Sequence, residues 1–132
     1  MKYLLDTNIC IYLIKQKPLS VLEKLRSNDI KDLALSSITV AELEYGVMRS
    51  QNKEQNMDAL HRFMIPYEIV DFTSKSAVKY GEIRTYLEKK GQIIGPMDLL
   101  IASIAMVENM ILVTNNTKEF KRIPNLKLEN WV

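Results

Sequence analysis

The chain has 132 residues, of which 47% are hydrophobic and 26% are charged, so it can form a globular domain with a sizeable core. Its 4 Gly and 4 Pro exclude fibrous and disordered classes. One Cys and one His exclude a disulfide framework and a Cys/His zinc site, while a formal net charge of +2 neither requires nor excludes a nucleic-acid partner.

The first third of the chain predicts one strand and two helices. Residues 3–5 are apolar and indicate a short buried strand, and residues 6–8 are typical of a helix cap. A short helix is expected over residues 9–14, and Pro18 either closes it or opens the next one. Leucines recur at helical spacing over residues 19–25, which predicts a second helix.

The next segment predicts a strand and two further helices. Residues 33–36 form a second strand candidate, and the pattern from Thr39 to Glu42 is typical of a capping box. A helix is therefore expected to begin at Thr39 and to end near Arg49. A polar turn at residues 51–56 then leads into another helix.

The second half continues this alternation. Residues 68–72 alternate like a strand, and residues 73–90 predict a long amphipathic helix that Gly91 stops. Residues 96–107 predict a helix with Pro in its first turn. This helix is apolar nearly all round, so it should be central and buried. Residues 110–114 are the clearest strand candidate.

Two short elements close the chain, a helical turn that starts at residues 116–119 and an edge strand at residues 126–128. Strands that alternate with helices imply an α/β fold, with a mostly parallel sheet that helices cover on both faces. No linker, repeat or low-complexity stretch divides the chain. Residues 1–132 are therefore expected to form one domain.

The sequence gives no indication of export or of a membrane anchor. The charge of Asp6 comes too early for the apolar core of a signal peptide. The longest apolar stretch, residues 99–107, is broken by Ser103 and is too short to span a bilayer. A reducing cytoplasm is the expected location.

Three isolated acidic residues, Asp6, Glu42 and Asp98, each adjoin an apolar run. Ligands of parallel sheets bind outside the carboxyl ends of the strands. Asp6 directly follows the first predicted strand, and Thr114 ends a later one. Glu42 and Asp98 are expected in the first turns of their helices, from which they could reach the same rim.

Each acid also has a purely structural explanation. Acidic residues near helix N-termini are stabilised by about 0.3–1 kcal/mol through the helix dipole. Asp6 fits a cap, Glu42 the third residue of a capping box, and Asp98 a first-turn carboxylate. The joint pattern favours a site, because an unpaired charge at the start of a buried helix is costly.

Converging carboxylates would repel one another and raise each other's pKa, a conflict that a divalent cation removes. Ligands that are all oxygen, with no Cys or His among them, favour Mg²⁺ or Mn²⁺ over zinc. A metal held by Asp6, Glu42 and Asp98 could hydrolyse a phosphodiester.

Four segments together resemble the PIN-domain ribonucleases, and more narrowly the VapC toxins of bacterial VapBC toxin–antitoxin pairs. The segments are Leu4-Leu5-Asp6-Thr7-Asn8, residues 37–46 around Glu42, residues 94–102 around Asp98, and residues 112–120. Each motif is weak alone, but four in order at suitable spacing are a strong signal. The resemblance runs nearly from end to end.

The resemblance implies a five-stranded parallel sheet and an Mg²⁺-dependent endoribonuclease, in which Mn²⁺ could substitute. Asp6, Glu42 and Asp98 would be its catalytic and metal-binding residues, Glu42 through a water. The fourth acidic position of the wider family is Asn116 here, which could hold a metal-bound water. Glu119 could supply the missing carboxylate, although residues 116–119 also read as a cap followed by a third-position acid.

Five further residues are weaker candidates. Thr7 and Thr114 are expected to lie behind the carboxylates or to face a phosphate, with helix capping as an equal alternative. Asn8 could cap the first helix or touch the site. Arg84 and Lys118 are the basic residues expected to contact RNA phosphates.

The resemblance also implies partners. A VapB-like antitoxin would wrap this domain, send an Arg or aromatic residue toward the acidic site, and provide the only contact with DNA. Residues 9–25 and 47–63 are expected to supply much of the antitoxin groove or of a homodimer surface. The favoured RNA substrate is a tRNA, specifically the anticodon region of initiator tRNA, whose cleavage would inhibit translation.

Two other functions fit the sequence less well. A phosphoaspartyl enzyme or receiver domain would use Asp6 as acceptor, but Asn8 stands where a haloacid-dehalogenase-type phosphatase needs a second acid. A binding module with the nuclease fold and little activity, serving RNA or a protein partner, stays open because of Asn116.

Overall fold

The computed structural model describes residues 2–132, and five short strands in this range form one sheet. The strands are β1 (Tyr3–Leu5), β2 (Leu33–Ser36), β3 (Glu68–Val70), β4 (Ile111–Val113) and β5 (Leu128–Glu129). Their order is β3-β2-β1-β4-β5, and every neighbouring pair is parallel. The expected sheet is confirmed and is parallel throughout.

Helices connect successive strands, as a parallel sheet requires. They are α1 (Thr7–Lys15), α2 (Leu19–Arg26), α3 (Ser37–Arg49), α4 (Lys53–Met64), α5 (Ser74–Lys89), α6 (Pro96–Val107) and α7 (Thr117–Phe120), with a 3-10 turn η1 (Ile30–Asp32) before β2. No helix within residues 2–132 has both the length and the apolar character needed to cross a membrane.

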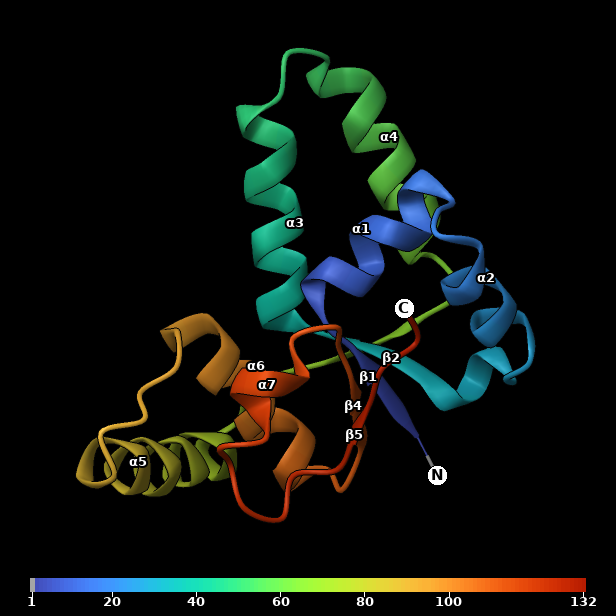
Figure 1. Cartoon of the computed structure of the whole chain (residues 1–132). Coiled ribbons are helices and arrows are strands. Elements are labelled where there is room, and N and C mark those ends of the chain that lie inside the picture. Colours follow the sequence, from blue (N-terminus) through green and yellow to red (C-terminus); the bar gives the residue numbers. More distant parts are fainter. Residues whose placement is uncertain (1) are drawn as a thin grey trace.

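Strand residues alternate between two cores, one on each face of the sheet. Leu4 and Leu112 point into a core that contains buried residues of α5 and α6. Leu5 and Val113 point into a second core, built with residues of α1, α2, α3 and α4. Figure 1 shows the two groups of helices on opposite sides of the strands, so helices cover both faces, as predicted.

Helix α6 is the central helix that the sequence predicts. Pro96 occupies its first position, and residues Ile101–Ala105 are all buried. Ser103 lies within this stretch, and its hydroxyl donates to the Leu99 carbonyl at 2.7 Å. The only polar side chain in the buried stretch is therefore satisfied without a partner from another element.

The predicted start of α3 is wrong. The helix begins at Ser37, and its cap is Ser36, whose hydroxyl accepts from the backbone N–H of Thr39 at 2.9 Å. Thr39 is thus the third residue of the helix rather than its cap. Glu42 consequently lies in the second turn, not in the first turn where the capping-box pattern placed it.

Helices α3 and α4 stand out from the sheet as an antiparallel pair, with α1 packed near their base (Figure 1). The first turns of α6 lie beside the N-terminal end of α3 (Figure 1). This arrangement places the start of α3 and the start of α6 near the carboxyl ends of the central strands.

Candidate active site

Asp6 and Thr114 lie side by side at the carboxyl edge of the sheet. They follow β1 and β4, which are neighbours with Leu5 opposite Val113. The Asp6 backbone N–H continues the ladder by donating to the Val113 carbonyl at 3.0 Å. The hydroxyl of Thr114, which is fully buried, lies close enough to the Asp6 carboxylate to lower its pKa. Both residues fall where the strand pattern predicts them.

Asp6 is both a helix cap and a buried acid. Its carboxylate accepts from the Ile9 N–H at 2.9 Å, which caps α1, so the structural role expected for it is confirmed. Only 5% of the residue is exposed. Burial raises the pKa of Asp6 to about 6, and repulsion from Asp98 and Glu42 adds to the rise, against the lowering effect of Thr114 and Ile9.

Asp98 lies in the first turn of α6, half-buried, as predicted. Burial raises the pKa of Asp98, and repulsion from Glu42 and then Glu119 raises it further. Gly95 precedes the helix, and a Cβ at this position would lie 3.9 Å from Asp98 Oδ2, an ordinary contact. The carboxylates of Asp6, Glu42, Asp98 and Glu119 therefore act on one another across four separate elements.

A hydroxyl network holds Glu42. The Thr7 hydroxyl donates to Glu42 Oε1 at 2.5 Å, and the Thr7 and Thr39 hydroxyls are hydrogen-bonded at 3.2 Å. Thr39 is completely buried. The first residue of α1 thus orients an acid on α3, which supports the expectation that Thr7 lies directly behind a carboxylate.

The fourth acidic position is shared between Asn116 and Glu119. Asn116 occupies the N-cap position of α7, but its side chain makes no cap hydrogen bond. Its amide instead donates to Glu119 Oε2 at 3.1 Å, while its backbone N–H donates to the Thr114 hydroxyl at 3.0 Å. The amide therefore holds Glu119 near Asp98, and the alternative of a simple capping motif does not describe this turn.

The remaining candidates are less closely tied to the acids. Asn8 is exposed in the first turn of α1, which Asp6 rather than Asn8 caps. Arg84 is exposed on α5 and engages Tyr80 and Glu88 of its own helix at 2.8 and 3.7 Å. Lys118 is exposed on α7, between Asn116 and Glu119. Of the two basic residues, only Lys118 is on an element of the site.

Sequence reasoning missed two contributors to this site. Thr39 was assigned to capping, although its position three residues before Glu42, on the same side of a helix, could have indicated a hydroxyl near that acid. The amide of Asn115 donates to the Tyr12 hydroxyl at 2.9 Å and ties the loop after β4 to α1. No sequence pattern signals a contact of this range.

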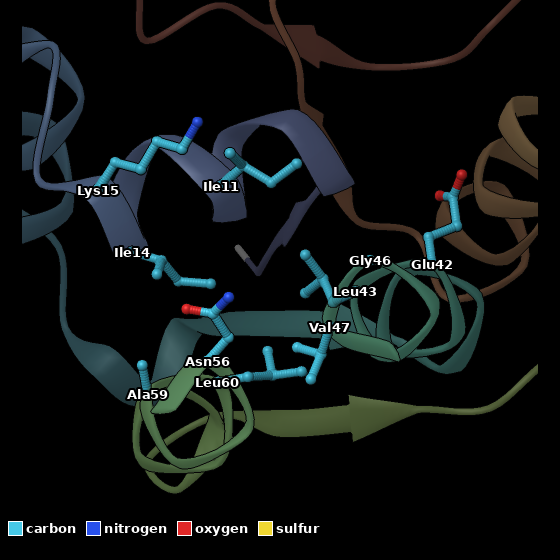
Figure 2. A pocket seen from close by; sticks show the side chains of 10 residues that line it. All are labelled: Ile11, Ile14, Lys15, Glu42, Leu43, Gly46, Val47, Asn56, Ala59 and Leu60. Atoms are coloured by element: carbon cyan, nitrogen blue, oxygen red, sulfur yellow. The ribbon is translucent and has the colours of Figure 1, made fainter. Parts of the chain in front are cut away.

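Apolar side chains of α1, α3 and α4 line a groove that runs up to the acidic site. It encloses about 320 Å³, and Figure 2 shows its ten lining residues, with Glu42 and Lys15 at its two ends. Most of the wall is aliphatic, including Ile11, Ile14 and Val47. The Glu42 carboxylate points away from this apolar wall (Figure 2).

The site offers the oxygen ligands that a hard cation prefers, but they are not already arranged around a single point. No group of three His, Cys, Asp or Glu side chains within residues 2–132 is already arranged to hold a metal ion. Glu42 and Glu119 are instead held by the neutral donors Thr7 and Asn116. Burial, and to a smaller extent repulsion between the acids, raises the pKa values of Asp6 and Asp98, and a bound divalent cation would oppose both effects.

Comparisons with known proteins agree with this geometry. The PIN-domain family model matches residues 3–126. Ribonuclease VapC2 of Rickettsia felis is 58% identical over 134 residues, with 99% of this chain and 98% of that protein covered. The tRNA(fMet)-specific endonuclease VapC of Shigella flexneri is 41% identical over 131 residues, with 99% and 98% covered.

A solved structure extends the likeness to three dimensions. The structure of VapBC2 from Rickettsia felis bound to a DNA fragment from their promoter matches with a TM-score of 0.92 and 55% identity, with both chains covered completely. The chain therefore belongs to the PIN-domain family, in its branch of VapC ribonuclease toxins.

Proposed function

We propose that this protein is a magnesium-dependent endoribonuclease that acts as the toxin of a toxin–antitoxin pair. The observation that carries the proposal is the convergence of Asp6, Glu42 and Asp98 at the carboxyl edge of a parallel sheet, where burial and, to a smaller extent, the neighbouring acids raise the pKa of Asp6 to about 6. Buried carboxylates in conflict are stabilised by a cation, and their all-oxygen chemistry suits Mg²⁺ or Mn²⁺. The proposal treats residues 1–132 as one nuclease domain.

The residues of the site have distinct tasks in this proposal. Asp6 and Asp98 would hold the ion directly, and Glu42 and Asn116 would hold it through water. When bound, such an ion lowers the pKa of a coordinated water and neutralises charge that develops on the phosphate. Thr114 and the Ile9 N–H fix the Asp6 carboxylate, and Thr7 orients Glu42.

Glu119 favours an active enzyme over a clamp that only binds. Asn116 removes one formal charge from the fourth position, but its amide brings in Glu119, whose charge acts on Asp98. The count of carboxylates around the site is thereby restored to four. An inactive binding module would have no need of this arrangement.

We propose the anticodon region of initiator tRNA as the substrate, because relatives 41% and 39% identical over nearly the whole chain are tRNA(fMet)-specific endonucleases. The test is end-mapping of total RNA after brief expression, beside an Asp6→Asn/Asp98→Asn double variant. A single cut in one tRNA loop, with a 5′-phosphate and a 3′-hydroxyl and only in the parent, is the expected result. A cyclic phosphate product would contradict the mechanism.

A binding measurement separates the metal proposal from activity. Titration with Mn²⁺, followed by electron paramagnetic resonance of the free ion, should show binding to the parent and loss of binding in the double variant. An equivalent variant at the exposed Asp58 of α4 provides the control. Equal Mn²⁺ binding by the parent and by the Asp6→Asn/Asp98→Asn variant would refute the assignment of the site.

We also propose that a VapB-like antitoxin occupies the groove of Figure 2, and that it alone links the toxin to DNA. Solved relatives are VapBC complexes bound to DNA, and the groove here is apolar with an acid at one end. An amphipathic segment with a cation at its end would complement both features. Replacement of half-buried Ile11 and Ile14 by Glu should weaken complex formation without altering Mn²⁺ binding.

Homodimer formation belongs to the same proposal and is tested by light scattering of the purified toxin. A mass twice the 15.3 kDa of one chain is expected. A monomer at all accessible concentrations would contradict it.

A further inference from the structure

Tyr45 and Arg49 form an exposed pair on α3 that the proposed chemistry does not use. The Tyr45 residue is 63% exposed, and the Arg49 guanidinium lies 5.0 Å from the centre of the Tyr45 ring. Within residues 2–132, Arg49 makes no ion pair with a carboxylate. A large aromatic surface and an uncompensated positive charge are therefore presented together to solvent.

Tyr45 and Arg49 follow Glu42 along α3. At 3.6 residues per turn, Tyr45 lies about one turn and Arg49 about two turns beyond Glu42 on the same side of α3. Leu43 and Val47 of the same helix are buried and point into the core. The C-terminal half of α3 stands clear of the sheet (Figure 1), so the helix leads from Glu42 outward to the pair.

We propose that Tyr45 and Arg49 form a shelf on which a base of the RNA strand stacks, a few nucleotides from the phosphate that is cleaved. The inference rests on the proposed ribonuclease function and adds a recognition surface to it. Aromatic rings and Arg planes are the surfaces on which unpaired bases of RNA stack, and Arg adds a contact to the backbone. The occupant is therefore a single-stranded or looped segment of RNA.

The electrostatics of the site favour RNA over a protein partner on this face. Four carboxylates near the cleavage point repel the phosphates that flank it, so binding requires positive charge and stacking a few nucleotides away. Arg49 and Tyr45 supply both on the same helix as Glu42. The apolar groove proposed for a peptide adjoins this face of α3 at Glu42, but its lining includes neither Tyr45 nor Arg49.

The experiment measures RNA binding without cleavage. Variants are made in an Asp98→Asn background, and affinity for a fluorescein-labelled anticodon stem–loop of initiator tRNA is followed by anisotropy. Tyr45→Ala should weaken binding about tenfold, because a lost base–aromatic stack is of this order. Tyr45→Phe keeps the ring and should restore most of the affinity. Arg49→Ala should lower the slope of log affinity against log salt by about one.

The chain offers a matched control. Tyr86 on α5 is also an exposed tyrosine with a cation over its ring, the Lys90 ammonium at 5.3 Å. It borders Met106, near the end of α6 opposite to Asp98. Tyr86→Ala should leave affinity and salt slope as in the parent. An equal loss in both alanine variants would overturn the shelf, because it would show a general effect of removing surface rings.

Two other outcomes distinguish this inference from the function on which it rests. If the parent cuts and binds RNA, but Tyr45→Ala binds equally well and instead loses the homodimer or the antitoxin, the face is a protein interface and the shelf is refuted. If the parent neither cuts nor binds RNA, the ribonuclease proposal fails and the shelf fails with it.

Discussion

Asp6 shows how one residue can stabilise a fold and strain it at the same time. As a cap it satisfies the Ile9 N–H, but as a charge it is buried and faces two other acids. The cap was predictable from its position after a strand, and so was the approach of other acids, since an acid among apolar residues at the end of a strand stands out. What sequence could not show is that burial dominates its energetics, because burial depends on residues distant in the chain.

Asp6→Asn should stabilise the metal-free protein at neutral pH. The folded pKa of about 6 lies above the ordinary 3.8, so the folded state binds the proton more tightly and stability falls as pH rises through this range. Ionisation of Asp6 then lowers the free energy of unfolding by about 3 kcal/mol. Asn has no charge to bury and can still cap α1, so the variant avoids this loss. Urea unfolding in EDTA at about pH 7.5 and pH 4 measures the free energy of unfolding of the parent and of the variant. The variant should be the more stable protein only at the higher pH. Asp58→Asn, on the surface, should show no such gain.

Thr7→Val should impair Glu42 rather than the fold. The valine keeps the size of threonine but cannot donate the 2.5 Å hydrogen bond to Glu42. Loss of a group that orients a metal-site residue typically costs 10–100-fold in metal affinity or activity, so about tenfold slower RNA cleavage is expected. Thr7→Ser should restore the rate. Wild-type cleavage by the valine variant would show that the hydroxyl has no positioning role.

At the scale of elements, the sequence located helices and strands better than it located their ends. Three hydroxyl residues, Ser36, Ser37 and Thr39, precede or open α3, and each can cap a helix. The cap is Ser36 because β2 ends there, and the end of β2 is set by its pairing with β1 and β3. A tertiary contact therefore decides a boundary that local patterns leave open.

Substitution of Gly46 in α3 should change the stability of the toxin and its affinity for the antitoxin in opposite directions. It lies in mid-helix, lines the groove of Figure 2, and a Cβ built on it meets nothing within 4 Å. Gly46→Ala should therefore stabilise the toxin by about 0.5–1 kcal/mol, because glycine is a poor helix former. The added methyl would project into the groove and should weaken antitoxin binding, measured by calorimetry.

Gly81 provides the matched control for that substitution. It lies in the middle of α5, and an added Cβ there also meets nothing within 4 Å. Gly81→Ala should raise the melting temperature similarly and leave antitoxin affinity unchanged. If Gly46→Ala also binds antitoxin as tightly as the parent, the partner does not approach this part of α3.

At the scale of the whole molecule, the site joins parts of the chain that the fold alone brings together. Its acids come from the end of β1 and from α3, α6 and α7, which are spread from Asp6 to Glu119. The fold was predictable because one or two helices follow each strand until the last, and strand polarity together with the early positions of Glu42 and Asp98 in their helices indicated that three acids could meet. The hydrogen bond between Asn116 and Glu119 was not predictable from the sequence, since it depends on the orientation of one amide.

A bound cation should therefore stabilise the entire fold. An ion that binds only the folded state raises the free energy of unfolding by about 2.7 kcal/mol at a concentration 100 times its Kd. Mg²⁺ should raise the melting temperature of the parent, and less so at about pH 5, where protons compete for Asp6 and Asp98. The Asp6→Asn/Asp98→Asn variant should show no shift. A similar shift in that variant would indicate that Mg²⁺ binds elsewhere.

The order of the strands also determines when a chain that is still being synthesised can complete the acidic site. β4 is among the last elements to be synthesised, yet it lies between β1 and β5, and its Val113 carbonyl accepts from the Asp6 N–H. While the ribosome still holds this region, β1 has an open edge and the acids on α3 and α6 have no completed neighbour. The acidic site is therefore completed only once almost the whole chain has emerged from the ribosome.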